Sequence, residues 1–223
     1  MKTKDTKKGF RLINIIFVII ILIVFAGIYI PTLGRHPGKK HYNNMQCSSN
    51  LKQIGFALIM YSNDNDGKFP TDTAGPMKAL SLLYPKYISE KKVFRCPSDK
   101  LVTKESNASI MEGIAFTANQ CSYGYDNTHT QADDPGVGLA SDRPPTTIDD
   151  VNCSPNHGGK PAVGGGTPGK GQNVVYLDGH VEFVSSPLAG WYDASGNREN
   201  IWMLEKKVGA GGATDTYIRH DGK

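Results

Sequence analysis

The chain of 223 residues is long enough for one domain with a substantial core, or for two small domains. Five of its 25 basic residues and one of its 21 acidic residues lie within residues 1–11, so the formal net charge of +4 belongs to this start and the remainder is neutral. A nucleic-acid-binding domain carries its basic footprint on the folded part. The charge distribution therefore excludes nucleic acid as an expected partner.

A hydrophobic segment follows the basic start. From Leu12 to Ile30 there are 19 residues with one clearly polar member, Asn14. A helix of this length spans about 28 Å, which is close to the hydrocarbon thickness of a bilayer. A cleavable secretory signal has a shorter apolar region that ends in small residues. We therefore expect a transmembrane helix over residues 10–31, with a cytoplasmic N-terminus because lysines precede it.

The N-terminus resembles that of type IV prepilins and type II secretion pseudopilins. The resemblance rests on residues 7–10, KKGF, and on the unbroken apolar stretch that follows them. It implies that residues 1–9 are a leader, and that a prepilin peptidase cuts between Gly9 and Phe10 and methylates Phe10. One position departs from the family: a glutamate that pairs with a neighbouring subunit's N-terminus is replaced by Asn14. An amide does not neutralise an ammonium group within a bilayer, so this departure argues against filament assembly.

Residues 32–44 contain Gly34, Pro37 and Gly38 and are expected to break the helix as a linker. Helical periodicity then resumes and predicts an amphipathic helix that ends at the turn formers of residues 63–67. The apolar face of this helix is expected to carry Met45, Leu51, Ile54, Leu58 and Tyr61. Further along the chain we expect a short helix at Met77–Leu83 and strands at Ser122–Tyr125 and Asn173–Val184.

The segment Asn173–Val184 has Asp178-Gly179 between two alternating runs, which is typical of a β-hairpin. Pairing of Leu177 with His180 would give this hairpin one apolar face, formed by Val174, Tyr176, Val181 and Phe183. Such a hairpin needs a helix to cover it. We therefore expect a loop-rich α+β fold: a transmembrane helix, and a second, amphipathic helix packed on a small antiparallel sheet, as in pilins.

Three further segments resemble the prepilin-like proteins that are abundant in planctomycetes and their relatives: residues 47–55, 61–70 and 94–99. Those proteins carry a C-terminal domain of unknown function, which is defined by a histidine, a spacer and Asp-Gly. The resemblance implies that His157 is the signature histidine and that Asp178-Gly179 is the Asp-Gly pair. Residues 45–223 would then form an extracytoplasmic pilin-like domain.

The spacer is longer here than in that family, because 20 residues separate His157 from Asp178. The excess lies in residues 158–171, which are rich in glycine. This composition is typical of a flexible surface insertion.

Four cysteines, Cys47, Cys96, Cys121 and Cys153, lie in the part expected outside the cytoplasm, where disulfides persist. Of the three connectivities, we expect Cys47–Cys96 with Cys121–Cys153, because the first pair would tie the amphipathic helix to the following loop. Zinc ligation and free thiols are the alternatives, although the sequence contains no Cys-x-x-Cys spacing.

Two other groups of residues have the chemistry of a metal site. Asp64 and Asp66 resemble part of a calcium loop, but an EF-hand would need a glutamate where Thr73 stands, and a turn that ends the helix is favoured. His157, Asp178 and His180 could form a metal or acid–base site. The sequence has no Gly-x-Ser-x-Gly elbow, phosphate loop or His-Glu-x-x-His helix. We therefore expect no catalytic residues, no cofactor and no enzymatic activity.

These observations predict a pseudopilin-like, non-enzymatic protein of the bacterial inner membrane that acts in a type II secretion or pilus-like system or at the cell surface. Its expected partners are the prepilin peptidase, the lipid bilayer, and other pseudopilins or envelope proteins. The alternative is a membrane-tethered extracytoplasmic module that binds a ligand such as a glycan and uses only the prepilin targeting route. Asn14 favours this alternative. A third hypothesis, an extracytoplasmic metalloenzyme, requires a metal at His157 or His180.

Overall fold

The computed structural model describes residues 14–25, 39–146, 148, 152–158, 169–192, 196–203 and 216–220. The chain divides into two compact units, Met1–Lys39 and Lys40–Lys223.

In the first unit, residues 14–25 form a helix. Its large apolar side chains are exposed, from 39% at Ile21 to 65% at Ile23. Among the described residues, no helix is both long enough and apolar enough to cross a membrane. The rest of the expected span over residues 10–31, and the expected leader at residues 1–9, lie outside the described residues.

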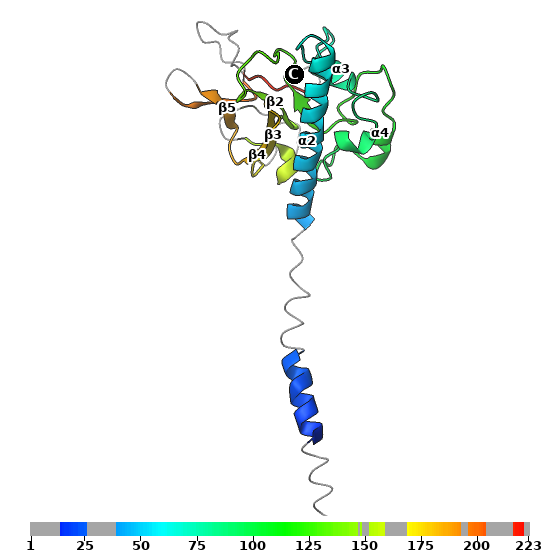
Figure 1. The fold of residues 1–223 in the computed structure, drawn as a ribbon, viewed down its shortest axis with the longest axis vertical. Helices are drawn as coiled ribbons and strands as arrows, with labels where there is room; N and C mark the ends of the chain where they lie inside the picture. Colours follow the sequence, from blue (N-terminus) through cyan, green and yellow to red (C-terminus); the bar gives the residue numbers. More distant parts are fainter. Residues whose placement is uncertain are drawn as a thin grey trace, which may run out of the picture. The chain divides into compact units, whose positions relative to one another are not determined.

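The second unit is built around α2, which spans Lys39–Asp64 (Figure 1). Residues 39–44 contain neither glycine nor proline and already belong to α2, so the linker expected over residues 32–44 ends no later than residue 38. Residues 32–38 lie outside the described residues. The face of α2 that enters the core carries Cys47, Leu51, Ile54, Ala57 and Leu58. Their spacing of three and four residues is that of one helical face. Met45, which we expected on this face, is 60% exposed.

Turn formers end α2 as the sequence predicts. The carbonyl oxygen of Ser62 accepts hydrogen bonds from the backbone N–H groups of Asn65 (3.1 Å) and Gly67 (2.9 Å). Asp66 and Gly67 both have positive φ, 54° and 77°. Aspartate and glycine adopt this left-handed conformation more readily than most residues, so the chain can reverse here.

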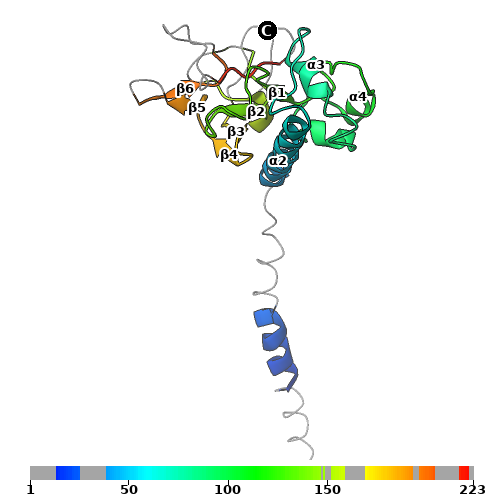
Figure 2. The same ribbon diagram turned by 45° about the horizontal axis from the view of Figure 1, so that its top comes forward.

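Short helices and loops cover the side of α2 that faces away from the strands (Figure 2). They are α3 (Pro76–Ser81), η1 (Lys91–Phe94) and α4 (Lys104–Ala108). α3 confirms the predicted short apolar helix. α4 was not predicted; Thr103 caps its N-terminus, because the Thr103 side chain accepts a hydrogen bond from the backbone N–H of Ser106.

Within the described residues, the strands form one antiparallel sheet of four strands and a separate pair. The four-stranded sheet has the order β1 (Tyr123–Tyr125), β2 (Gly138–Asp142), β3 (Gln172–Tyr176) and β4 (Val181–Val184). β5 (Leu188–Tyr192) pairs with β6 (Arg198–Asn200). The α+β class with a small antiparallel sheet is thus confirmed, as are strands near residues 122–125 and 173–184.

The β3–β4 hairpin is one residue away from the expected register. The backbone N–H of Tyr176 donates to the carbonyl oxygen of His180 (3.0 Å), which leaves three residues in the turn, whereas pairing of Leu177 with His180 would leave two. Gly179, with a φ of 82°, provides the left-handed residue that closes a three-residue turn. A shift of one residue moves every side chain to the opposite face. The expected shared face was therefore wrong for Val174, Tyr176, Val181 and Phe183.

Both faces of β3 are buried. On one face Val175 packs against α2 at Gly55, where an added Cβ would lie 2.6 Å from Cγ2 of Val175. On the other face Val174 and Tyr176 join a second apolar cluster, which also contains Ala189, Ile201, Trp202 and Ile218. An antiparallel strand is often covered on one face only, whereas β3 is covered on both. The wrong register follows from the two-residue turn that we expected at Asp178-Gly179.

Candidate functional site

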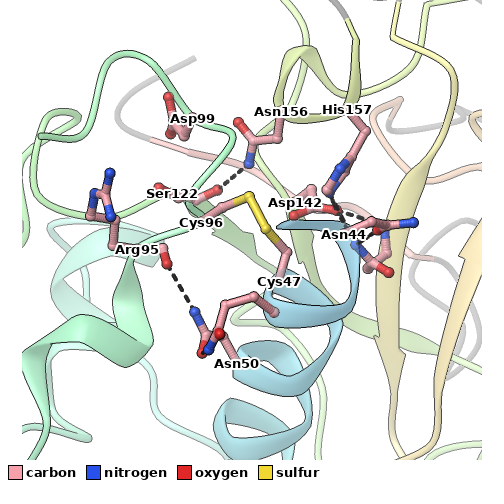
Figure 3. The surroundings of a disulfide bond; sticks show 12 residues. Asn44, Cys47, Asn50, Arg95, Cys96, Asp99, Ser122, Asp142, Asn156 and His157 are labelled. Atoms are coloured by element: carbon pink, nitrogen blue, oxygen red, sulfur yellow. Dashed lines mark hydrogen bonds and ion pairs between the residues drawn. A yellow bond between two sulfur atoms is a disulfide. The ribbon is translucent and has the colours of Figure 1, made fainter. Parts of the chain in front are cut away.

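A disulfide joins α2 to the segment that follows η1. Cys47 and Cys96 are bonded, as predicted, and both are fully buried (Figure 3). The bond closes a loop over a sequence separation of 49 residues, for which the chain-entropy relation gives a stabilisation of about 4 kcal/mol. This cross-link fixes the N-terminal half of α2 against the loops on the side of the helix that faces away from the strands.

The second expected disulfide was wrong, because Cys121 and Cys153 are both buried thiols. The thiol of Cys121 lies 3.6 Å from the carbonyl oxygen of Tyr123. Burial raises the pKa of the Cys153 thiol. A raised pKa lowers the fraction of thiolate, which is the reactive form, so Cys153 has the character of an inert core residue.

A buried polar cluster lies beside the disulfide. Its centre is the carboxylate of Asp142 on β2, whose Oδ2 lies 2.8 Å from Nε2 of His157 at the end of η2 (Pro155–His157). The same carboxylate oxygen accepts hydrogen bonds from Asn173 on β3, from the backbone N–H (2.7 Å) and from the side-chain amide (2.8 Å). The Asn173 amide also donates to Oδ1 of Asn44 on α2 (2.9 Å). Residues of η2 and β3 therefore contact the carboxylate of β2 directly, and α2 joins the cluster through Asn44.

The second oxygen of Asp142 has no such support. Asp142 is fully buried, and its Oδ1 has no hydrogen-bond partner among the described residues. Buried carboxylate oxygens in native structures are normally hydrogen-bonded or bound to a metal. The donor atoms of Asp142, His157, Cys47 and Cys96 all lie within 4.8 Å of one another. This cluster is therefore the place in the described chain where residues of metal-binding chemistry converge.

The structure does not bring the expected signature pair together. His157 contacts Asn173 near the start of β3, whereas Asp178 lies in the turn past its end. Five residues along a strand correspond to roughly 16 Å. Asp178 instead binds His180: its Oδ1 lies 2.6 Å from Nδ1 and accepts the backbone N–H at 2.9 Å. Partial burial raises the pKa of Asp178, but these hydrogen bonds outweigh it and lower the pKa overall.

Sequence reasoning found His157 but missed its true partners, Asp142 and Asn173. β2 has the sequence GLASD with every residue buried, so it lacks the alternation that marks a strand. The sequence pattern identifies Asn173 only as the first residue of a strand, whereas the structure shows a buried amide. The described part of residues 158–171 is Gly158 and residues 169–171; the rest of the expected insertion lies outside the described residues.

The weak calcium candidates occupy the turn after α2. Oδ2 of Asp64 accepts hydrogen bonds from Lys86 and from the hydroxyl of Tyr87, both at 2.9 Å. The hydrogen bond from Lys86 lowers the pKa of Asp64. Asp66 contributes the left-handed residue of the turn. Asp64 is thus engaged with a cation of the protein, Lys86.

A second buried histidine lies between two carboxylates. The Nε2 of His129 is 3.3 Å from Asp126, its Nδ1 is 3.1 Å from Asp133, and its side chain is 3% exposed. Asp126 also accepts hydrogen bonds from Thr128, in the turn after β1. Burial opposes the charge of His129, but the two carboxylates outweigh burial and raise its pKa.

A buried ion pair holds the C-terminal residues on the sheet. Nε of Arg143 is 3.0 Å from Asp99, and its Nη2 donates to the carbonyl oxygen of Cys121 (2.7 Å). His220 lies 3.4 Å from Nη1 of Arg143 and 3.0 Å from the same carbonyl oxygen. Burial and the positive charge of Arg143 lower the pKa of His220 to about 3. These groups satisfy one another, which is the pattern of a structural network.

Two open grooves flank α2. The first, of about 580 Å³, lies between α2 and β4 and exposes the large side chains of Met45, Phe56 and Phe183; Asn173 lines it as well. The second groove, of about 730 Å³, lies on the other side of α2. Its lining contains one acidic residue, Glu90, and four basic residues, Lys91, Lys92, Arg95 and Lys104.

The His129 cluster predicts a pH dependence of stability. The unfolded histidine loses its proton near pH 6.5, whereas the folded one keeps it to higher pH. Between these two pKa values the folded state holds more protons, so the free energy of unfolding falls as pH rises, by at most about 1.4 kcal/mol per pH unit. Urea unfolding between pH 6 and 9 should show this slope in the wild type and a smaller slope in His129→Gln. His180→Gln, on an exposed turn, is the control; equal slopes for wild type and His129→Gln would contradict the assignment.

Comparison of the chain with known proteins adds no family. No protein-family model, no curated protein and no solved structure matches it. The resemblance to prepilin-like proteins therefore stays a prediction from the sequence motifs.

Proposed function

We propose that this chain is a membrane-anchored, pseudopilin-like envelope protein that binds other proteins and catalyses no reaction. The observation that carries the proposal is the packing of α2 on an antiparallel sheet, because the sequence resemblance implies this pilin-like arrangement. The helix at residues 14–25 supports an anchor. Its exposed isoleucine, leucine and phenylalanine side chains are stable only against lipid or another protein.

The groove between α2 and β4 supports a role in protein binding. Met45, Phe56 and Phe183 are 60%, 52% and 42% exposed, and they lie along one groove. β4 is an edge strand of the four-stranded sheet. Exposed apolar side chains beside an open strand edge are typical of a surface that another protein covers. The partners would be other pseudopilins or envelope proteins at the bacterial inner membrane.

The polar groups of the core support a non-enzymatic role. Arg143 is bound by Asp99, and His129 by Asp126 and Asp133, so these titratable residues are already engaged within the protein. In this proposal the prepilin peptidase recognises the leader and cuts after Gly9, and the domain after residue 44 lies outside the cytoplasm. Asn14 in place of the family's glutamate would limit incorporation into a filament.

The proposal predicts the mass of the mature protein. Intact mass spectrometry of the membrane-extracted chain should show the loss of residues 1–9 and the gain of one methyl group on Phe10. Gly9→Val should retain the full-length mass, because the expected cleavage site is removed, whereas the matched variant Gly34→Ala should be processed normally. A full-length mass for the wild type would contradict the pseudopilin proposal.

The basic groove favours a second candidate function, a tethered module that binds an acidic glycan. Four basic residues and one acidic residue line this groove. Lys92 is paired with Glu90 at 3.2 Å, and Nζ of Lys91 donates to the carbonyl oxygen of Ala108 (2.8 Å), which orients the two cations. A groove with one dominant sign of charge concentrates ligands of the opposite sign.

This second function predicts salt-sensitive binding. The full chain in detergent should bind a sulfated polysaccharide more tightly than neutral dextran, and less tightly as salt rises. The double variant Lys92→Glu/Lys104→Glu should weaken binding by about tenfold, since each reversal of an exposed charge contributes up to about 1 kcal/mol. The control is the double variant Lys52→Glu/Lys68→Glu, which changes the net charge by the same amount at residues outside this groove. Equal loss in both double variants would contradict a site in the groove.

A further inference from the structure

We propose that Cys47, Cys96, Asp142 and His157 form a redox-controlled site for a divalent transition metal of the Zn²⁺ type. The site would be open when the two cysteines are thiols and closed when they form the disulfide. The proposal rests on the convergence of two sulfurs, one carboxylate oxygen and one imidazole nitrogen within 4.8 Å. All four residues are buried.

The spacing of these donors is close to that of a tetrahedral site. Zn–S bonds of about 2.3 Å and Zn–N or Zn–O bonds of about 2.0 Å place the ligand atoms roughly 3.3–3.8 Å apart. Cleavage of the disulfide lets the two sulfurs separate from bonding distance toward this spacing. The imidazole and carboxylate, whose Nε2 and Oδ2 are already 2.8 Å apart, then need to approach the sulfurs by no more than about 1.5 Å. Two thiolates, a histidine and a carboxylate are a ligand set that zinc accepts in four-coordinate sites.

The unpartnered Oδ1 of Asp142 is an independent observation that points to a ligand. The oxygen is fully buried and accepts no hydrogen bond among the described residues, while Oδ2 of the same carboxylate is held by His157 and Asn173. A disulfide offers no hydrogen-bond donor, so the closed state leaves Oδ1 unsatisfied. A metal ion bound at Oδ1 would remove this cost.

The surroundings supply the support and the access that a metal site needs. Asn173 binds both the carboxylate and, at 3.1 Å, the imidazole, and it is itself held by Asn44. Such outer hydrogen bonds orient metal ligands. Asn44 and Asn173 also line the groove between α2 and β4, so the groove reaches the outer hydrogen-bond partners of the cluster. The ring of Phe183 covers His157 edge-on, with the centroids 5.9 Å apart.

Conversion of the disulfide to the two thiols requires a dithiol as reductant. A dithiol, free or in a thiol–disulfide exchange protein, gives two electrons and two protons to the Cys47–Cys96 bond and becomes a disulfide itself. The two cysteine thiols then bind one divalent ion and release two protons. Because both cysteines are fully buried, exchange requires local opening, and the dithiol state also exists in the newly folded chain before oxidation.

The test compares the oxidised and reduced full chain in detergent, with thiol counts to establish each state. After reduction and anaerobic removal of the reductant, the chain should bind about one Zn²⁺ and release protons, whereas the oxidised chain should bind none. Co²⁺ as a probe should give thiolate charge-transfer absorption and tetrahedral d–d bands in the reduced chain only. Asp142→Asn and His157→Gln should each weaken Zn²⁺ binding, by at least about tenfold. His180→Gln should bind as the wild type does.

Three results would overturn the proposal. They are equal binding by oxidised and reduced chains, equal binding by the reduced wild type and by both ligand variants, and Co²⁺ spectra without thiolate bands. Circular dichroism covers the case in which reduction unfolds the chain. In that case added Zn²⁺ should restore the native spectrum, and a chain that stays unfolded with Zn²⁺ and binds none also contradicts the site.

Discussion

The disulfide between Cys47 and Cys96 is the constraint on which the rest of the domain depends. α2 has strands on one side and short helices and loops on the other, and the disulfide crosses from the helix to the loop side. Further along α2, toward its C-terminus, the close contact of Gly55 with Val175 sets the distance between helix and sheet. The cross-link fixes the position of α2 along the sheet, and the contact fixes its distance from the sheet. The polar cluster around Asp142 is built at the point that the cross-link defines.

Much of this arrangement could be predicted from local sequence patterns. The spacing of Leu51, Ile54 and Leu58 predicted the buried face of α2, and the turn formers at residues 63–67 predicted where it ends, because both signals are local. The β3–β4 hairpin was located correctly, but its register was not. Asp-Gly suits both a two-residue and a three-residue turn, and the second apolar cluster, which covers the other face of β3, comes from distant residues such as Trp202 and Ile218.

The candidate site was harder to predict because its members are distant in sequence and polar. His157 was singled out by resemblance, and its expected partner was Asp178, but the structure pairs it with Asp142. Nothing local marks Asp142, because every residue of β2 is buried and a buried strand of this kind has no alternation. Of the two expected disulfides, Cys47–Cys96 was right and Cys121–Cys153 was wrong. The position of Cys47 on the amphipathic helix favoured a link to the following loop, but no local pattern shows that Cys121 and Cys153 remain thiols inside the core.

The central claim is that one disulfide of defined partners holds α2 and places the polar cluster beside it. The most direct test is peptide mapping of the full chain extracted from membranes, with thiols alkylated before proteolysis without reductant. The account predicts a linked pair of peptides that contain Cys47 and Cys96, and alkylated Cys121 and Cys153. A linkage between any other pair, or alkylation of all four cysteines, would contradict it.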